Sequence, residues 1–247
     1  MTFLTPMILA RISLAGKALE LLGGCYLAYD LLDGRNGPLR SIARATGYVP
    51  LFLLGYAVVL GWPFALVASA GMGALLAIEF HFAMLKTKAP HWIEPALGFC
   101  RGLVLGTAAM TILGATYGAV LGVIAGIGLV VGNAIGLAPR DDYDPKARPG
   151  LRPHNVMASL FRGVIFGLSA VIAGEILRVP DALISALKLG AAAGGVSLLV
   201  GVFSPVIERW IGHAPQRVLG IIGLILLFVG TAIDAAPDIV EALGLHL

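Results

Sequence analysis

The chain has 247 residues, of which 58% are hydrophobic and only 13% are charged, and it contains 33 glycines in addition. The charged fraction is about half of the roughly 25% typical of soluble globular domains, and the mean hydropathy is +0.92. These values exclude a disordered chain, a disulfide-rich secreted module and an ordinary cytosolic enzyme, and they indicate a polytopic membrane protein. The formal net charge of +3 fits retention of Lys and Arg on the cytoplasmic side, so we do not interpret it as nucleic-acid binding.

The first half of the chain contains five predicted membrane-crossing helices. The first helix covers residues 6–32 and is followed by a polar loop. The apolar run 45–85 is too long for one crossing, which needs about 20 residues. The Gly-Trp-Pro sequence at 61–63 therefore divides it into a second and a third helix. The run 96–137 is also of double length, and we divide it near Gly114 into a fourth and a fifth helix.

The second half of the chain contains three further predicted crossings. Residues 138–153 form the most polar stretch of the chain. The sixth helix follows at 154–177, and the seventh continues to residue 203. We expect a loop over 204–216 because it contains proline, charged residues and histidine. The eighth helix then covers residues 217–233, and an acidic tail follows it.

Basic residues alternate from one connection to the next. They follow the first, third, fifth and seventh helices, whereas the breaks between helices two and three and between helices four and five contain none. The link between the sixth and seventh helices contains a single basic residue, Arg178. The positive-inside rule then places the basic loops in the cytoplasm and both termini outside. We therefore predict an all-α, polytopic transmembrane bundle of about eight helices. Residues 1–247 would form a single integral membrane domain in a cell membrane of the bacterial inner-membrane type.

Small residues recur every four positions in the helices predicted to run inward, which allows helix backbones to approach closely in lipid. In the fifth helix a second row of glycines begins at Gly128 on the opposite face, so we expect neighbours on two faces. Two of the other helices begin alike, with F-C-R-G-L-V-L-G at 99–106 and L-F-R-G-V-I-F-G at 160–167. This pattern favours four helical hairpins closed by basic loops. The alternative is a chance pattern, because four-residue spacings of small residues arise often in a chain this rich in Gly and Ala. The residues assigned to this glycine zipper packing are Gly114, Gly118, Gly122, Gly126, Gly190 and Gly194.

Four ionisable residues fall in one layer of the predicted membrane. Lys17 and Glu20 lie one turn apart in the first helix, so they share a face. Glu175 and Lys188 fall at a similar depth in the sixth and seventh helices. A charge in hydrocarbon costs about 2.5–3.5 kcal/mol on insertion scales and normally faces a partner in the bundle. We therefore expect a salt bridge between the first pair and the second, either lining a polar cavity or gate or serving as a static cluster that orients helices.

The loop before the sixth helix is dense in charges of both signs. Its aspartates Asp141, Asp142 and Asp144 are of the kind that hold Mg²⁺ against a diphosphate. Intramembrane prenyltransferases use two acidic loops of this kind, whereas this chain has one. The alternative is a solvated cytoplasmic loop in which Arg148 and Arg152 form local ion pairs or contact a partner. We assign no catalytic residue, metal or cofactor, because the sequence has no catalytic triad, phosphate loop or clustered metal-ligand spacing.

Three functions from different classes fit these features. The first is a small secondary transporter or channel for a small solute or ion, which the charged layer and the broken double-length helices favour. The second is a non-catalytic membrane subunit or assembly factor, because the glycine-rich helix faces suit docking of other helices. The third is a lipid-modifying or prenyl-transferring enzyme. The expected partners are the lipid bilayer and either a second copy of the chain or other membrane subunits, with no nucleic acid.

The predicted topology is tested by reporter fusions. A reporter fused after Leu247 should report an outside location, and one inserted within residues 140–150 should report a cytoplasmic location, because only the second segment is rich in basic residues. Paired reporters that are active on opposite sides of the membrane measure this. A cytoplasmic signal from the C-terminal fusion would contradict the orientation.

Overall fold

The structure is a computed structural model in which all secondary structure within the described residues is helical. The described residues are 6–31, 40–84, 92–135, 150–213 and 216–238. The chain divides into two compact units, which we call the terminal unit (1–43 and 213–247) and the central unit (44–212). Each unit is described by itself. The prediction of one domain over the whole chain stays a prediction.

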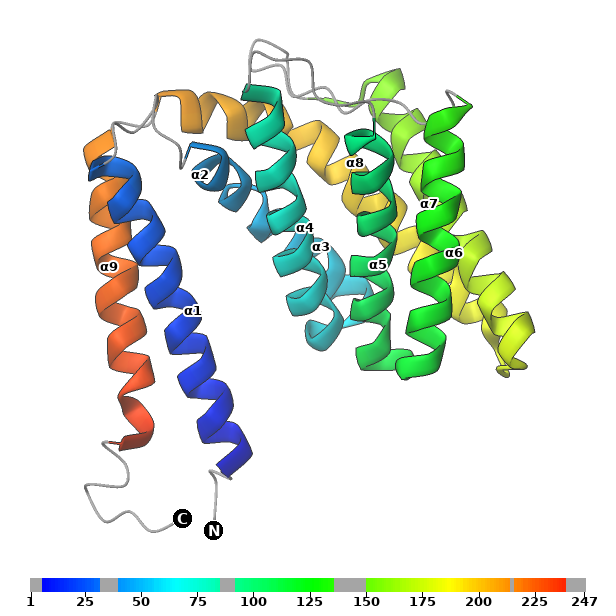
Figure 1. Cartoon of the computed structure of the whole chain (residues 1–247), viewed down its shortest axis with the longest axis horizontal. Coiled ribbons are helices and arrows are strands. Elements are labelled where there is room, and N and C mark those ends of the chain that lie inside the picture. The colour runs from blue at the N-terminus through cyan, green and yellow to red at the C-terminus, as the bar shows by residue number, and fades with distance from the viewer. Residues whose placement is uncertain (1–5, 32–39, 85–91, 136–149, 214–215, 239–247) are drawn as a thin grey trace. The chain divides into compact units, whose positions relative to one another are not determined.

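The helices follow the predicted crossings, with one crossing divided in two. The predicted second helix, which begins at residue 45, corresponds to α3 and to the last two residues of α2, and a turn at Gly47 and Tyr48 separates these two helices. The helices, shown in Figure 1, are α1 (Pro6–Leu31), α2 (Arg40–Thr46), α3 (Val49–Leu60), α4 (Trp62–Met84), α5 (Ile93–Leu113), α6 (Ala115–Ala134), α7 (Pro153–Leu177), α8 (Ala182–His213) and α9 (Gln216–Asp234). Six helices of the described chain have the length and apolar composition needed to cross a membrane, which confirms the predicted all-α membrane bundle.

Both predicted breaks in the double-length runs are confirmed, and each occurs at a glycine with positive φ. Gly61 has a φ of 85° between α3 and α4, and Gly114 has a φ of 90° between α5 and α6. Glycine adopts this region without the steric cost that a Cβ atom imposes, so it stops one helix and lets the next begin immediately. The end of the central unit at these breaks is called the turn end, and the opposite end, where α5 and α7 begin, the basic end (Figure 1).

The predicted end of the seventh helix is wrong. The structure continues α8 to His213, ten residues beyond the expected end at residue 203, with Pro205 inside the helix. A proline removes one backbone N–H and normally kinks or ends a helix, which is why the sequence predicts a loop there. In a membrane bundle, however, neighbouring groups can satisfy the backbone carbonyl that a proline leaves free. The consequence is that Ser204 and Glu208 lie on a helix and not in a loop.

Glycine–glycine contacts join the helices of the terminal unit. Helices α1 and α9 run antiparallel (Figure 1). A methyl group placed on Gly16 would lie 2.7 Å from the carbonyl oxygen of Gly230, and one placed on Gly23 would lie 2.6 Å from that of Gly223. In each helix the two glycines are seven residues apart, which places them on one face. Backbone therefore packs directly on backbone along this pair.

The same type of contact joins α5 to α6 in the central unit. Gly102 and Gly106 of α5 lie against Gly126 and Gly122 of α6, and a methyl group on Gly102 or Gly106 would overlap the opposing backbone. On another face of α6, a methyl group on Gly128 would lie 3.1 Å from the Ile165 side chain of α7. Helix α6 therefore contacts α5 and α7 through two different rows of glycines.

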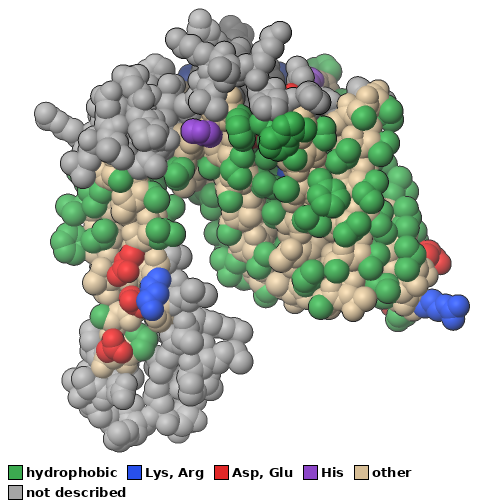
Figure 2. Space-filling view, in the orientation of Figure 1, with side chains coloured by type: hydrophobic (Ala, Val, Ile, Leu, Met, Phe, Trp, Pro, Cys, Tyr) green, Lys and Arg blue, Asp and Glu red, His purple; other side chains and the backbone are tan. Residues whose placement is uncertain are grey.

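The surface of the central unit is largely apolar. Figure 2 shows hydrophobic side chains over most of its visible face. Three tryptophans are exposed: Trp62 at the turn end, and Trp92 and Trp210 at the basic end. Tryptophan is enriched where a membrane meets water, so these positions fit the two faces of a bilayer. The chain is a multi-pass membrane protein whose apolar helices contact lipid.

The close approach of α5 and α6 is tested by Gly106→Leu and Gly122→Leu. Both variants should lower the apparent Tm in detergent, because the added side chain forces the two backbones apart, and overpacking typically costs about 1–3 kcal/mol. Gly195→Leu is the matched control, since a Cβ atom there meets no atom within 4 Å. Equal melting of all three variants would show that the glycines are an accident of composition.

Candidate functional site

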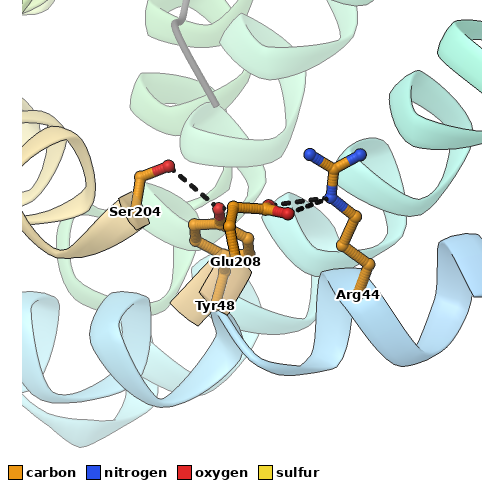
Figure 3. Close-up of polar contacts among 4 residues, drawn as sticks. All are labelled: Arg44, Tyr48, Ser204 and Glu208. Carbon is orange, nitrogen blue, oxygen red and sulfur yellow. Dashed lines mark hydrogen bonds and ion pairs between the residues drawn. The ribbon is translucent and has the colours of Figure 1, made fainter. Parts of the chain in front are cut away.

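Two helices that are distant in sequence meet in a buried polar cluster of the central unit (Figure 3). Arg44 lies in α2, and Glu208 lies in the part of α8 that follows Pro205. The Arg44 Nε donates a hydrogen bond to both carboxylate oxygens of Glu208, each at 2.7 Å. This ion pair joins segments 164 residues apart near the basic end of the unit.

A tyrosine and a serine complete the cluster. The Tyr48 hydroxyl donates to Oε1 of Glu208 at 2.7 Å, and the Ser204 Oγ lies 3.0 Å from the same hydroxyl. Since the single hydroxyl proton of Tyr48 is used toward the carboxylate, the Ser204 hydroxyl donates to the Tyr48 oxygen. The result is a directed chain of hydrogen bonds that ends on Glu208.

Local helix geometry explains why these four residues meet. Ser204 and Glu208 are four residues apart on α8, so they share one face. Arg44 lies in the last turn of α2 and Tyr48 directly precedes α3, so the turn between these helices brings both side chains to the same carboxylate. Helices α3 and α8 are in contact, because Gly55 has no side chain and the backbone of α3 therefore lies close to the Val196 side chain of α8. The two polar pairs therefore oppose each other.

Most side chains of this cluster are buried inside the central unit. Tyr48 and Ser204 are 0% and 1% exposed, and Glu208 is 7% exposed. The Arg44 guanidinium carbon also lies 4.1 Å from the ring centroid of Phe80 in α4, a cation–π contact. Arg44 thus links α2, α4 and α8.

Two further arginines make polar contacts between helices in the central unit. The Arg101 Nη2 of α5 donates to Oε2 of Glu79 in α4 at 2.5 Å. The Arg162 Nη1 of α7 donates to the Ser197 Oγ of α8 at 2.7 Å. Both arginines belong to the two segments of similar sequence at 99–106 and 160–167.

These two segments also resemble each other in their packing. In each, the arginine is followed by two glycines four residues apart that face two glycines of the next helix. Gly163 and Gly167 of α7 lie beside Gly194 and Gly190 of α8, as Gly102 and Gly106 lie beside Gly126 and Gly122. These glycine contacts therefore join α5 to α6 and α7 to α8, which are the helix pairs connected by short turns. The hairpins expected from the sequence are instead the helix pairs connected by basic loops. A four-hairpin repeat stays a prediction.

The predicted charged layer is divided between the two units. The Lys17 Nζ lies 3.9 Å from Oδ1 of Asp234, which also accepts a hydrogen bond from the Ser13 hydroxyl at 2.5 Å. Glu175 and Lys188 are exposed residues of the central unit. Their predicted pairing with Lys17 or Glu20 stays a prediction, because the two units are described separately. Asp234, expected in an acidic tail, instead ends α9.

The charged loop before α7 lies mostly outside the described residues. Asp141, Asp142, Asp144 and Arg148 are among the residues that are not described, and Arg152 directly precedes α7. Within the described ranges, no group of three or more His, Cys, Asp or Glu side chains is placed to hold a metal ion. The predicted Mg²⁺-binding and partner-binding roles of this loop stay predictions.

The sequence did not reveal the buried cluster. Arg44 is one of the basic residues that follow the first predicted helix, and Glu208 falls within the loop predicted over 204–216. The available signal was the matching four-residue spacing of Arg44 with Tyr48 and of Ser204 with Glu208. Comparison of the chain with protein-family models, with curated proteins and with solved structures finds no match.

The buried ion pair is tested by single and double substitutions. Arg44→Met or Glu208→Met alone should destabilise the protein strongly, because removing one partner of a buried pair typically costs about 3–5 kcal/mol. The Arg44→Met/Glu208→Met double variant should regain most of this loss, since it leaves no unpaired charge. Unfolding in detergent at increasing denaturant measures all three. Additive losses in the double variant would show that the two charges do not interact.

Proposed function

We propose that this protein is a small secondary transporter for a small solute or ion, and that the Arg44–Glu208 pair is its gate at the basic end. The observation that carries the proposal is a buried carboxylate, held by an arginine and a tyrosine, beside a proline in a membrane-crossing helix.

Stability alone is a poor reason for keeping this pair. Removing two charges from water costs several kcal/mol per ion, and their mutual attraction only roughly repays it. Replacing a buried ion pair by apolar residues is often neutral or stabilising by about 1–4 kcal/mol. An ionisable group inside a membrane bundle is therefore a candidate functional group by default. Glu208 and Arg44 fit this description, because Glu208 is buried, Arg44 is half-buried, and the pair bridges separate helices.

The position of Glu208 on α8 also supports a gate. Transporters commonly place their sites where the regular hydrogen bonding of a membrane helix is broken. Pro205 removes one such bond, while α8 itself continues to His213. Glu208 lies three residues after Pro205, in the last turns of α8. A gate needs two states that differ by only a few kcal/mol in free energy. When this part of α8 separates from α2 and α4, the attraction between Arg44 and Glu208 is lost but the hydration of both charges is regained, and these two free-energy contributions nearly cancel. Opening would thus expose Arg44 and Glu208 to the cytoplasmic side.

A non-catalytic membrane subunit is the second candidate, and one observation favours it. Among the described residues, every buried side-chain nitrogen or oxygen has a hydrogen-bond partner. Fully satisfied polar groups are what a static scaffold requires. Under this alternative the Arg44–Glu208 pair would fix the position of α2 against α8. The protein would then co-purify from native membranes with another membrane subunit or with a second copy of itself.

The wider setting follows from the charge distribution. We infer that the basic end faces the cytoplasm of a cell membrane of the bacterial inner-membrane type, since its connections contain most of the Lys and Arg. A lipid-modifying or prenyl-transferring enzyme remains the third alternative. That alternative depends on the aspartates of the loop before α7.

The transport proposal is tested by flux into liposomes that contain the purified protein. Proton entry is followed with a trapped pH-sensitive dye under an imposed potassium diffusion potential, and entry of small neutral and charged solutes by light scattering. The wild type should exceed protein-free liposomes for at least one probe. The Arg44→Met/Glu208→Met variant should melt close to the wild type and lose at least about tenfold of that flux, because two apolar side chains keep the closed packing but present no charge to the solute when the gate opens.

The matched control is the Glu79→Met/Arg101→Met double variant. It also removes one interhelical ion pair of the central unit, but its carboxylate is more exposed, since the Glu79 side chain is 28% exposed and that of Glu208 is 7% exposed. Its flux should resemble that of the wild type. No flux for any probe with folded wild-type protein would contradict transport and favour the membrane-subunit alternative.

A further inference from the structure

The Asn155 side chain lies next to the part of α8 that contains Pro205. Residue 205 would normally donate its amide to the carbonyl of Gly201, four residues earlier, but proline has no N–H. The Asn155 side chain, from the first turn of α7, donates its Nδ2 to that same Gly201 carbonyl oxygen at 2.9 Å. A side-chain donor from another helix therefore occupies the acceptor that Pro205 leaves free.

The surroundings of Asn155 fit this role. Asn155 is 8% exposed, so an unmade hydrogen bond here could not be replaced easily by water. A methyl group on Gly201 would lie 2.8 Å from the Asn155 side-chain carbonyl carbon, so the contact also requires glycine at this position. Because the group opposite is a carbonyl, only the amide nitrogen of Asn155 can face it.

We propose that Asn155 is a positioning residue that substitutes for the missing amide of Pro205 and so allows α8 to continue to Glu208. An unsatisfied carbonyl in a membrane bundle is costly, and without Asn155 the helix would fray or bend at Ser204–Pro205. Residues 206–213 would then lose the orientation that brings Glu208 to Arg44. Asn155 thus acts on the ion pair through α8 and does not contact it.

The gating consequence rests on the proposed function, but the structural role does not. If Glu208 is the gate carboxylate, Asn155 sets how readily the gate opens, because it determines how firmly the last turns of α8 follow the rest of the helix. If the chain does not transport, Asn155 still completes α8. The experiment below measures stability and local exchange only, so the two proposals can fail independently.

The test is a double-mutant cycle between Asn155 and Pro205 in the full-length purified chain. Asn155→Ala should lower the apparent Tm by several degrees in the wild-type background. In a Pro205→Ala background residue 205 regains its own N–H, so the same substitution should cost less than about half as much. Hydrogen–deuterium exchange should report faster exchange of the amides of residues 206–210 in Asn155→Ala and near wild-type exchange in the double variant.

The matched control is Ser159→Ala. Ser159 lies one turn further along α7 and donates to the Gly194 carbonyl at 2.6 Å. The helical donor to that carbonyl, the amide of Leu198, is present in every variant. The substitution Ser159→Ala should therefore lower the apparent Tm equally in the wild-type and Pro205→Ala backgrounds. Asn155→Leu keeps the approximate size but removes the donor, so it should also lower the apparent Tm. An equal cost of Asn155→Ala in both backgrounds, or wild-type behaviour of Asn155→Leu, would overturn the proposal.

Discussion

The hydrocarbon core of a membrane offers no water to satisfy backbone or side-chain polar groups. In this chain, the need to pair such groups within the protein accounts for both its helices and their contacts. Lipid also supplies no hydrophobic force between helices, so association depends on close packing and on hydrogen bonds. The chain uses glycine for the first, as between Gly106 and Gly122, and buried polar residues for the second, as between Arg44 and Glu208.

These two devices are distributed differently in the central unit. Glycine rows join helices that are consecutive in sequence, such as α5 with α6, where the contact is long and regular. The Arg44–Glu208 pair instead joins helices from the beginning and the end of the unit's sequence. Tyr48, Ser204 and Phe80 lie around this pair. A directional interaction at one point specifies which distant helices meet, whereas a glycine groove alone would accept many partners.

Pro205 connects the packing of α8 with the buried cluster. A proline in a long membrane helix removes one backbone bond and loosens the segment after it. Here that segment contains Glu208, the residue on which the Arg44 and Tyr48 hydrogen bonds converge. The proline within α8 and the buried carboxylate are therefore parts of one arrangement, which is why the proposed gate is placed there and not at the exposed Glu175 or Lys188.

The sequence by itself determined the membrane class, the all-helical fold and the breaks at Gly61 and Gly114, because apolar length and glycine conformation are local properties. It did not determine the end of α8 or the site. Whether a proline ends a helix depends on what satisfies its free carbonyl, and here Asn155 of α7 does so. Likewise, the partner of Arg44 is 164 residues away. Only the tertiary structure decided these points, because each depends on groups that folding brings together from distant parts of the chain.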